Sequence, residues 1–116
     1  GIDNIKKIKM NIVELLKHLK SLEEAEKFIN GELPEVEYDL VDIYMINKLG
    51  LDSEIVFFNA EEIPNRLIIN IEGINYENLF PLNLAQEMVE ELKASNDKIS
   101  DVEIAKHLLE YREKDF

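Results

Sequence analysis

The sequence has 116 residues, with 25 Asp and Glu against 13 Lys and Arg, and it contains no Cys and no Trp. The length is typical of one domain, and the composition, 46% hydrophobic and 33% charged, is that of a globular protein. The net charge of −12 disfavours direct nucleic-acid binding, because such a surface repels phosphate. The lack of Cys excludes thiolate catalysis, disulfides and cysteine zinc sites.

No segment has the pattern of an export signal or a membrane span, because the longest apolar runs, such as residues 55–58, fall far short of about 20 residues. We therefore expect a cytoplasmic protein without membrane contact, present as a monomer or weak dimer. Gly1 is not an initiator residue and Met10 is an alternative start. We treat residues 1–9 as a non-native or extended N-terminal segment and expect no function there.

Hydrophobic periodicity predicts helices at the N-terminal end. Apolar residues at helical spacing form one stripe over residues 5–19. Ser21 and Glu24 match a capping box at the start of a second, short helix, which Asn30-Gly31 would end. Residues 34–49 combine the helix start signal of Pro34 with an apolar face at helical spacing, although residues 36–40 also alternate as a strand would. We predict a third helix there.

The second half of the chain predicts a small sheet followed by two helices. Residues 54–58 and 66–72 are rich in Ile, Val and Phe, and we expect them to pair as an antiparallel, hairpin-like element followed by a turn at Gly73 and Asn75. A helix is predicted from residue 83 to about 95, and a capping box at 100–103 predicts the last one. The expected fold is a single compact α+β domain over residues 1–116, with two to three N-terminal helices.

The negative charge is concentrated in one part of the chain. Residues 1–20 carry five Lys against two acids, a net charge of +3, whereas residues 21–45 carry eight acids against Lys27 alone, a net charge of −7. On the predicted third helix, Glu35, Asp39 and Asp42 would form one stripe at positions i, i+4 and i+7. The stripe has three interpretations: a solvated face, a docking surface for a cationic partner, or a site for a hard cation, for which the EF-hand pattern is missing.

Tyrosines within this acidic stretch favour the docking interpretation. Tyr38 and Tyr44 lie among the acids, and tyrosine is a preferred residue of binding hot spots because it combines apolar area with a hydroxyl. Tyr44 also lies on the predicted apolar face, where it would be a core residue. The predicted partner-binding residues are Glu35, Tyr38, Asp39, Asp42, Glu23 and Glu24.

Catalytic patterns are weak in this sequence. The four Ser lie outside any Gly-x-Ser-x-Gly elbow, and the four Gly are isolated. Each His follows a Glu by four residues, in the pairs Glu14–His18 and Glu103–His107, and Glu110 could join the second pair. A metal or acid–base site could use such a pair, but helix-supporting i, i+4 contacts are the more ordinary interpretation. We predict no catalytic residue, no metal and no cofactor.

In size, acidity and lack of catalytic machinery the chain resembles bacterial immunity proteins, the cytoplasmic inhibitors of colicin-type and contact-dependent growth inhibition toxins. Residues 37–44 are similar in character to the acidic, tyrosine-bearing surface that nuclease immunity proteins present to basic toxins. The chain departs from the nuclease-colicin immunity family in its greater length and its predicted strands. The resemblance implies an antitoxin that acts by protein–protein interaction.

We therefore expect a non-catalytic acidic inhibitor that binds and occludes a cationic, nuclease-type toxin domain. One alternative is an acidic protein that mimics nucleic acid and blocks a host defence nuclease, and another is a small enzyme that uses carboxylates or the Glu103–His107 pair. A further alternative is an accessory subunit whose apolar surface lies at an obligate interface.

Overall fold

The computed structural model describes residues 5–114. This part of the chain forms an α+β domain in which one antiparallel sheet is covered by helices. In chain order the elements are β1 (Ile5–Lys7), α1 (Ile12–Leu16), α2 (Leu22–Glu32), the 3-10 turn η1 (Tyr38–Leu40), β2 (Val41–Ile46), β3 (Ile55–Asn59), the 3-10 turn η2 (Ala60–Glu62), β4 (Ile68–Ile71), β5 (Ile74–Pro81), α3 (Leu82–Ser95) and α4 (Asp101–Lys114).

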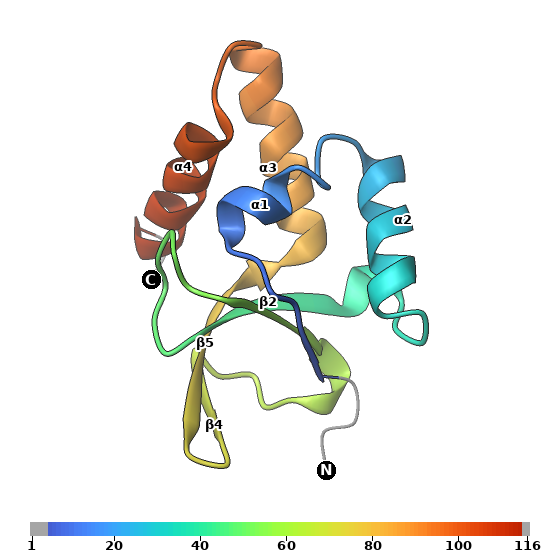
Figure 1. Ribbon diagram of the computed structural model, residues 1–116, viewed down its shortest axis with the longest axis vertical. Coiled ribbons are helices and arrows are strands. Elements are labelled where there is room, and N and C mark those ends of the chain that lie inside the picture. The colour runs from blue at the N-terminus through green and yellow to red at the C-terminus, as the bar shows by residue number, and fades with distance from the viewer. Residues whose placement is uncertain (1–4, 115–116) are drawn as a thin grey trace.

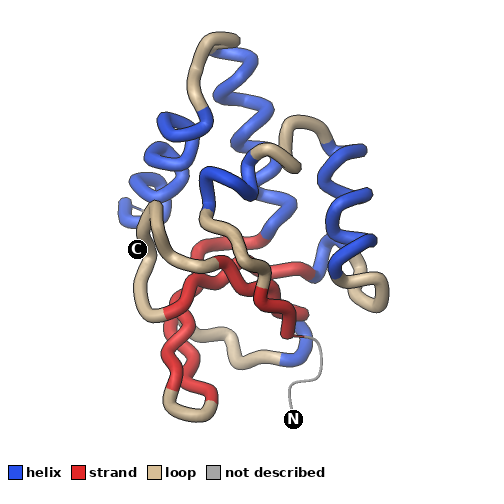
Figure 2. The backbone as a smooth tube through the Cα atoms, in the orientation of Figure 1, coloured by secondary structure: helices blue, strands red, loops and turns tan. Residues whose placement is uncertain are grey.

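The five strands are ordered β1-β3-β2-β5-β4, and every neighbouring pair is antiparallel. All four helices lie on one side of this curved sheet (Figure 1). The connection between β3 and β4 runs along the opposite side (Figure 2), which we call the far face. None of the helices in the described part of the chain is both long enough and apolar enough to span a bilayer.

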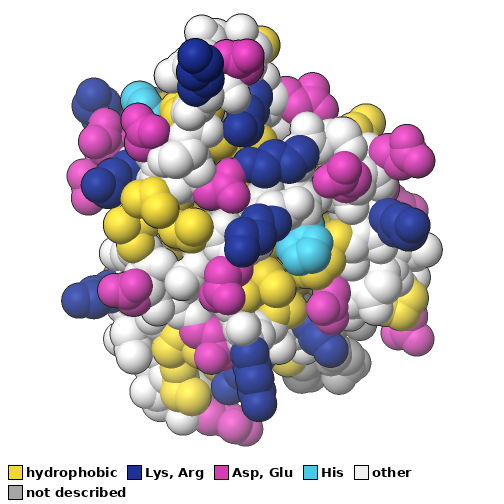
Figure 3. All heavy atoms as spheres, turned by 45° about the horizontal axis from the view of Figure 1, so that its top comes forward, with side chains coloured by type: hydrophobic (Ala, Val, Ile, Leu, Met, Phe, Trp, Pro, Cys, Tyr) yellow, Lys and Arg dark blue, Asp and Glu magenta, His cyan; other side chains and the backbone are white. Residues whose placement is uncertain are grey.

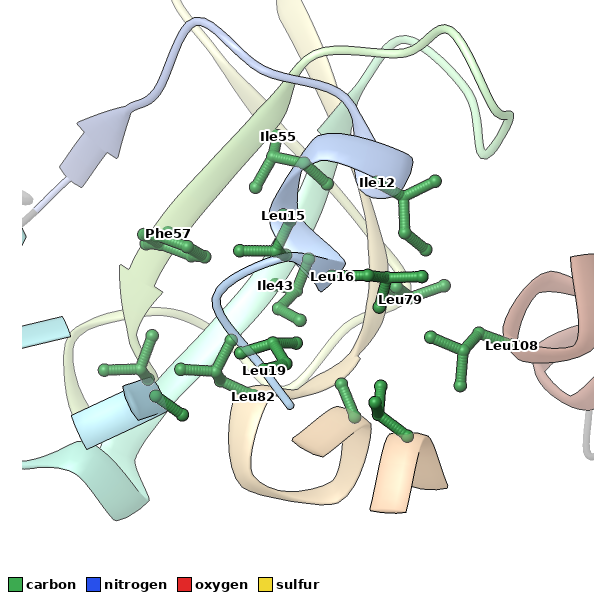
Figure 4. Close-up of a cluster of buried hydrophobic side chains, with 14 of the residues drawn as sticks. Ile12, Leu15, Leu16, Leu19, Ile43, Ile55, Phe57, Leu79, Leu82 and Leu108 are labelled. Atoms are coloured by element: carbon green, nitrogen blue, oxygen red, sulfur yellow. The ribbon is translucent and has the colours of Figure 1, made fainter. Parts of the chain in front are cut away.

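Side-chain alternation in the central strands builds two apolar cores. Ile43 of β2 and Phe57 of β3 point toward the helices and belong, with Leu16 and Leu108, to the larger core (Figure 4). Their neighbours along the strands point the other way and form the far-face core. Its buried members are Tyr44, Val56, Phe58, Ile69 and Tyr76.

Rings in the far-face core pack edge to face. The ring of Phe58 lies 4.9 Å from that of Tyr44 and 5.4 Å from that of Tyr76, both at steep interplanar angles. Ile63 of the β3–β4 connection packs against this core. The far face is therefore a second packed layer, closed by an irregular segment in place of helices.

The predicted N-caps of the second and last helices are confirmed, although at Ser21 only the Ser side-chain half of the predicted capping box forms among the described residues. The Ser21 side chain accepts a hydrogen bond from the Glu24 backbone N–H at 3.1 Å, and α2 begins at the next residue, Leu22. The Ser100 hydroxyl accepts from the Glu103 backbone N–H, while the Glu103 carboxylate accepts from the Ser100 backbone N–H, so α4 has the expected capping box. The predicted helix from residue 83 is also present, as α3.

The predicted helix over residues 5–19 is present only as α1, Ile12–Leu16. Ile5–Lys7, within the segment that we set apart, pair with β3 as an edge strand. The helix begins only at Ile12, because Asn11 and Glu14 form a capping box in which each side chain accepts a hydrogen bond from the other residue's backbone N–H at 3.0 Å.

The predicted third helix is also wrong, because residues 41–46 form β2, the centre of the sheet. Strand neighbours on both sides and cores on both faces bury four of its six positions, so apart from Asp42 the strand is apolar on both faces and periodicity does not distinguish it from a helix. The proposed pairing of 54–58 with 66–72 is wrong as well. β3 pairs with β1 and β2, and β4 pairs with β5.

A tight turn explains the pairing of β4 with β5. Glu72 and Gly73 both have positive φ, at 52° and 85°, as a two-residue hairpin turn of type I′ requires. Asn70 supports the turn, because its side-chain oxygen accepts a hydrogen bond from the Gly73 N–H at 3.2 Å. The predicted turn at Gly73 is therefore present, and it joins β4 directly to β5, a strand absent from the predicted elements.

Candidate functional site

Three of the predicted partner-binding residues line one hollow on the surface. Glu23, Glu35 and Tyr38 surround a depression of about 670 Å³ between α2 and the segment that follows it. Glu26 and Glu37 line the same depression, together with one cation, Lys27. We call this depression the acidic pocket.

The pocket forms because apolar anchors hold an irregular segment against α2. The Leu33 backbone N–H donates a hydrogen bond to the Ile29 carbonyl at 2.7 Å, at the C-terminal end of α2. The Val36 backbone N–H donates to the Leu33 carbonyl at 3.1 Å and forms the next turn. Leu33 and Val36 are buried in the larger core. Their neighbours Glu35 and Glu37 therefore point into solvent.

Tyr38 lies at the point where the negative charges of three segments converge. Burial, followed by the charges of Glu26 in α2, Asp39 in η1 and then Glu87 and Glu90 in α3, raises its pKa to about 12. The hydroxyl oxygen itself is buried and has no hydrogen-bond partner among the described residues. A ring with apolar packing and an unused hydroxyl thus lies in a strongly negative field.

The carboxylates of the pocket form no ion pair with any cation among the residues that the structure describes. Within residues 5–114 the ion pairs are Lys6–Glu32 and Lys20–Asp101, and neither involves a pocket residue. On the face shown in Figure 3, by contrast, acidic and basic side chains are intermingled. In the sequence, residues 21–45 alone carry a net charge of −7, and the pocket draws its acids from this stretch.

The stripe expected for Glu35, Asp39 and Asp42 does not exist, because the helix that would have aligned them is absent. Glu35 lines the acidic pocket, and Asp39 acts on Tyr38 through its charge without lining the pocket. Asp42 lies on β2 with its side chain on the far face, in a different cavity. Glu24 is exposed on the first turn of α2 and also lies outside the pocket lining.

Sequence reasoning missed Glu26, Glu37, Glu87 and Glu90. Glu26 could have been found, because it follows Glu23 by three residues on the same helix. The two acids of α3 carried no such signal. They approach Tyr38 only because α3 packs beside η1 in the folded domain.

The two Glu–His pairs have different outcomes. The Glu14 carboxylate accepts from the Asn11 N–H, and the His18 ring stacks on Phe28 at 4.0 Å with an interplanar angle of 9°. Glu103 does interact with His107, but hydrogen bonds from Ser100 are the larger causes of its lowered pKa. No group of three or more potential metal-binding His, Asp or Glu side chains occurs among residues 5–114.

No protein-family model, curated protein or solved structure matches this chain.

Proposed function

We propose that this chain is a non-catalytic inhibitor that binds a cationic protein through the acidic pocket, with a nuclease-type toxin domain as the partner and the chain as its immunity protein. The observation that carries the proposal is the convergence of unpaired carboxylates from α2, η1 and α3 around Tyr38. A field of this sign attracts a positive surface and accelerates its encounter.

The pocket has the elements of a binding hot spot. Glu23, Glu26 and Glu35 offer acceptors to Lys or Arg side chains, and Tyr38 offers apolar area beside them. Charge pairs that become buried in such an interface couple by about 1.5–7 kcal/mol, whereas pairs at the rim mainly change the association rate. Inhibition would follow by occlusion, when the bound chain covers the partner's active site or its nucleic-acid-binding surface.

The test compares two triple variants of equal net charge. Glu23→Lys, Glu26→Lys and Glu35→Lys reverse the pocket, whereas Asp52→Lys, Glu61→Lys and Glu110→Lys reverse exposed acids outside it. Each chain is immobilised and exposed to extract of the native cells at low and high salt. The captured protein is then purified and titrated with the chain.

We expect the natural chain and the control variant to retain one basic partner at 1:1 stoichiometry and to inhibit its activity, and the pocket variant to lose both properties. Equal binding by the two variants would remove the pocket from the proposal. Capture of many basic nucleic-acid enzymes, all released by salt, would instead support the alternative of a nucleic-acid mimic.

A further inference from the structure

A second cavity lies on the far face of the sheet, away from the acidic pocket. It has a volume of about 410 Å³, lies between the sheet and the β3–β4 connection, and is open to solvent on one side, where Pro64, Arg66 and Leu67 are exposed. Asp42, Tyr44 and Asn78 line it from the sheet side. The connection and the end of β5 supply the rest of the lining, which consists of Ala60, Ile63, Pro64, Asn65, Arg66, Leu67 and Pro81. No residue lines both this cavity and the acidic pocket.

An irregularity in β5 explains why this part of the far face is hollow. Ile43 pairs with Phe80 but the next residue of β2, Tyr44, pairs with Asn78, so Leu79 is an extra, bulged residue. Strict alternation after Asn78 would place Phe80 on the far face, close to Asp42. The bulge turns Phe80 toward the helices, where its ring lies 6.2 Å from that of Tyr111. The space beside Asp42 is therefore left without a large side chain.

The polar groups of the cavity differ in how well they are satisfied. Tyr44 is buried, and its hydroxyl donates to the Arg66 carbonyl at 3.4 Å and is hydrogen-bonded by the Asn78 side chain. The Asp42 carboxylate is half-buried and has neither a hydrogen bond nor an ion pair with any described residue. Its burial raises the pKa of this carboxyl.

An unpaired, half-buried carboxylate opposes folding, so the fold itself does not account for Asp42. Residues that conflict with the local rules of folding are concentrated at functional sites. The rest of the lining combines apolar side chains, among them Ile63 and Leu67, with the polar side chains of Tyr44, Asn65, Arg66 and Asn78. Arg66 is the one cation among these lining residues, and it makes no ion pair with Asp42. A pocket of about 300–1,000 Å³ that joins apolar surface to a small number of polar groups is the usual form of a small-ligand site.

We propose that this cavity binds an alkylammonium group, with the ammonium against the Asp42 carboxylate and the alkyl stem along Ile63 and Leu67. The group could belong to a small free amine or to a lysine side chain of another protein, since the chemistry of recognition is the same. The inference is independent of the proposed function, because it uses the opposite face of the sheet.

The experiment titrates the natural chain with n-butylammonium chloride while amide chemical shifts are followed by NMR. Asp42→Asn retains the shape of the side chain and removes its charge. Asp52→Asn is the matched control, because Asp52 is exposed and lies outside the cavity. Neutral n-butanol, which has the same stem, tests whether the cation is required. A parallel titration uses Nα-acetyl-lysine methylamide.

We expect saturable shifts confined to β2, residues 60–67 and Asn78, with at least tenfold weaker binding to Asp42→Asn and tenfold weaker binding of butanol. Binding of butylammonium but not of the lysine derivative would identify a free amine as the ligand source, and comparable binding of both would show that the cavity also accepts a lysine side chain. Absence of saturation by either amine, or equal binding by Asp42→Asn and the natural chain, would overturn the inference.

Discussion

Replacement of Tyr38 by Phe should stabilise the protein. The Tyr38 hydroxyl oxygen is buried without a hydrogen-bond partner among the described residues, whereas the ring packs against the larger core. A buried hydroxyl without a partner costs about 1–3 kcal/mol relative to its hydrated state. Because Tyr38 is only partly buried, we take the lower end, about 1 kcal/mol, as the expected gain in the free energy of unfolding.

The gain converts into a measurable change in Tm. With about 2.1 cal/mol/K of unfolding entropy per residue, a chain of 116 residues has an unfolding entropy of about 0.24 kcal/mol/K. A stabilisation of about 1 kcal/mol should therefore raise Tm by about 4 °C. Differential scanning calorimetry at neutral pH measures this change directly.

Tyr44→Phe is the matched control, because it removes a hydroxyl that is hydrogen-bonded. That hydroxyl donates to the Arg66 carbonyl, so its loss should cost about 0.5–1.5 kcal/mol and lower Tm by about 2–6 °C. The two substitutions delete the same atom and are expected to have opposite signs. A decrease in Tm for Tyr38→Phe similar to that for Tyr44→Phe would show that the Tyr38 hydroxyl is satisfied in solution and would refute the reasoning.

Three further substitutions test other parts of the structure. Burial raises the pKa of the Asp42 carboxyl above its ordinary value of 3.8, so the folded state binds a proton at Asp42 more tightly than the unfolded chain does. Protonated Asp42 therefore stabilises the folded state at pH below 3.8. This stabilisation is lost as the pH rises through the raised pKa. The free energy of unfolding of Asp42→Asn, measured by urea titration, should therefore increase relative to that of the natural chain as the pH rises through this range. A difference in free energy between the two chains that does not vary with pH would contradict the assignment. Phe58→Ala should lower the free energy of unfolding in urea by about 3–5 kcal/mol, because the Phe58 ring is fully buried between two tyrosines. Leu67→Ala, at an exposed position, is the control and should change it by less than about 0.5 kcal/mol. A loss as small as that for Phe58→Ala would mean that the far-face core is not packed. Ser21→Ala should cost about 1 kcal/mol and reduce the helical circular dichroism signal, and an unchanged unfolding midpoint would show that the cap is dispensable.

Local signals in the sequence were sufficient to predict those helix ends and turns that are stabilised by hydrogen bonds between residues close together in the chain. The caps at Ser21 and Ser100 act over three residues, and the turn at Gly73 needs only two residues with positive φ. A capping box at Asn11 and Glu14 was equally readable, but the apolar stripe that precedes it was interpreted as the first turns of the helix. Such interactions can be predicted from the sequence because both partners lie within a few residues of each other.

The central strands could not be derived in the same way. β2 is bordered by β3 and β5 and is buried on both faces, so its residues lack the polar–apolar alternation that distinguishes a half-exposed strand. The pairing of β3 with β1 joins Ile5 to Phe58, more than fifty residues apart in the sequence. Only the complete sheet decides these partners, because each strand would fit several others.

By itself the sequence determined an α+β chain with a concentration of negative charge in residues 21–45, because composition and short-range patterns require no tertiary contact. The tertiary structure decided where those charges lie. It gathered Glu23, Glu26 and Glu35 beside Tyr38 and added the acids of α3, and it moved Asp42 to the other side of the sheet. The physical reason is that residues 41–46 form a strand, in which neighbouring side chains point to opposite faces of the sheet, so that Asp42 lies on the far face. A helix would have kept Glu35, Asp39 and Asp42 on one face.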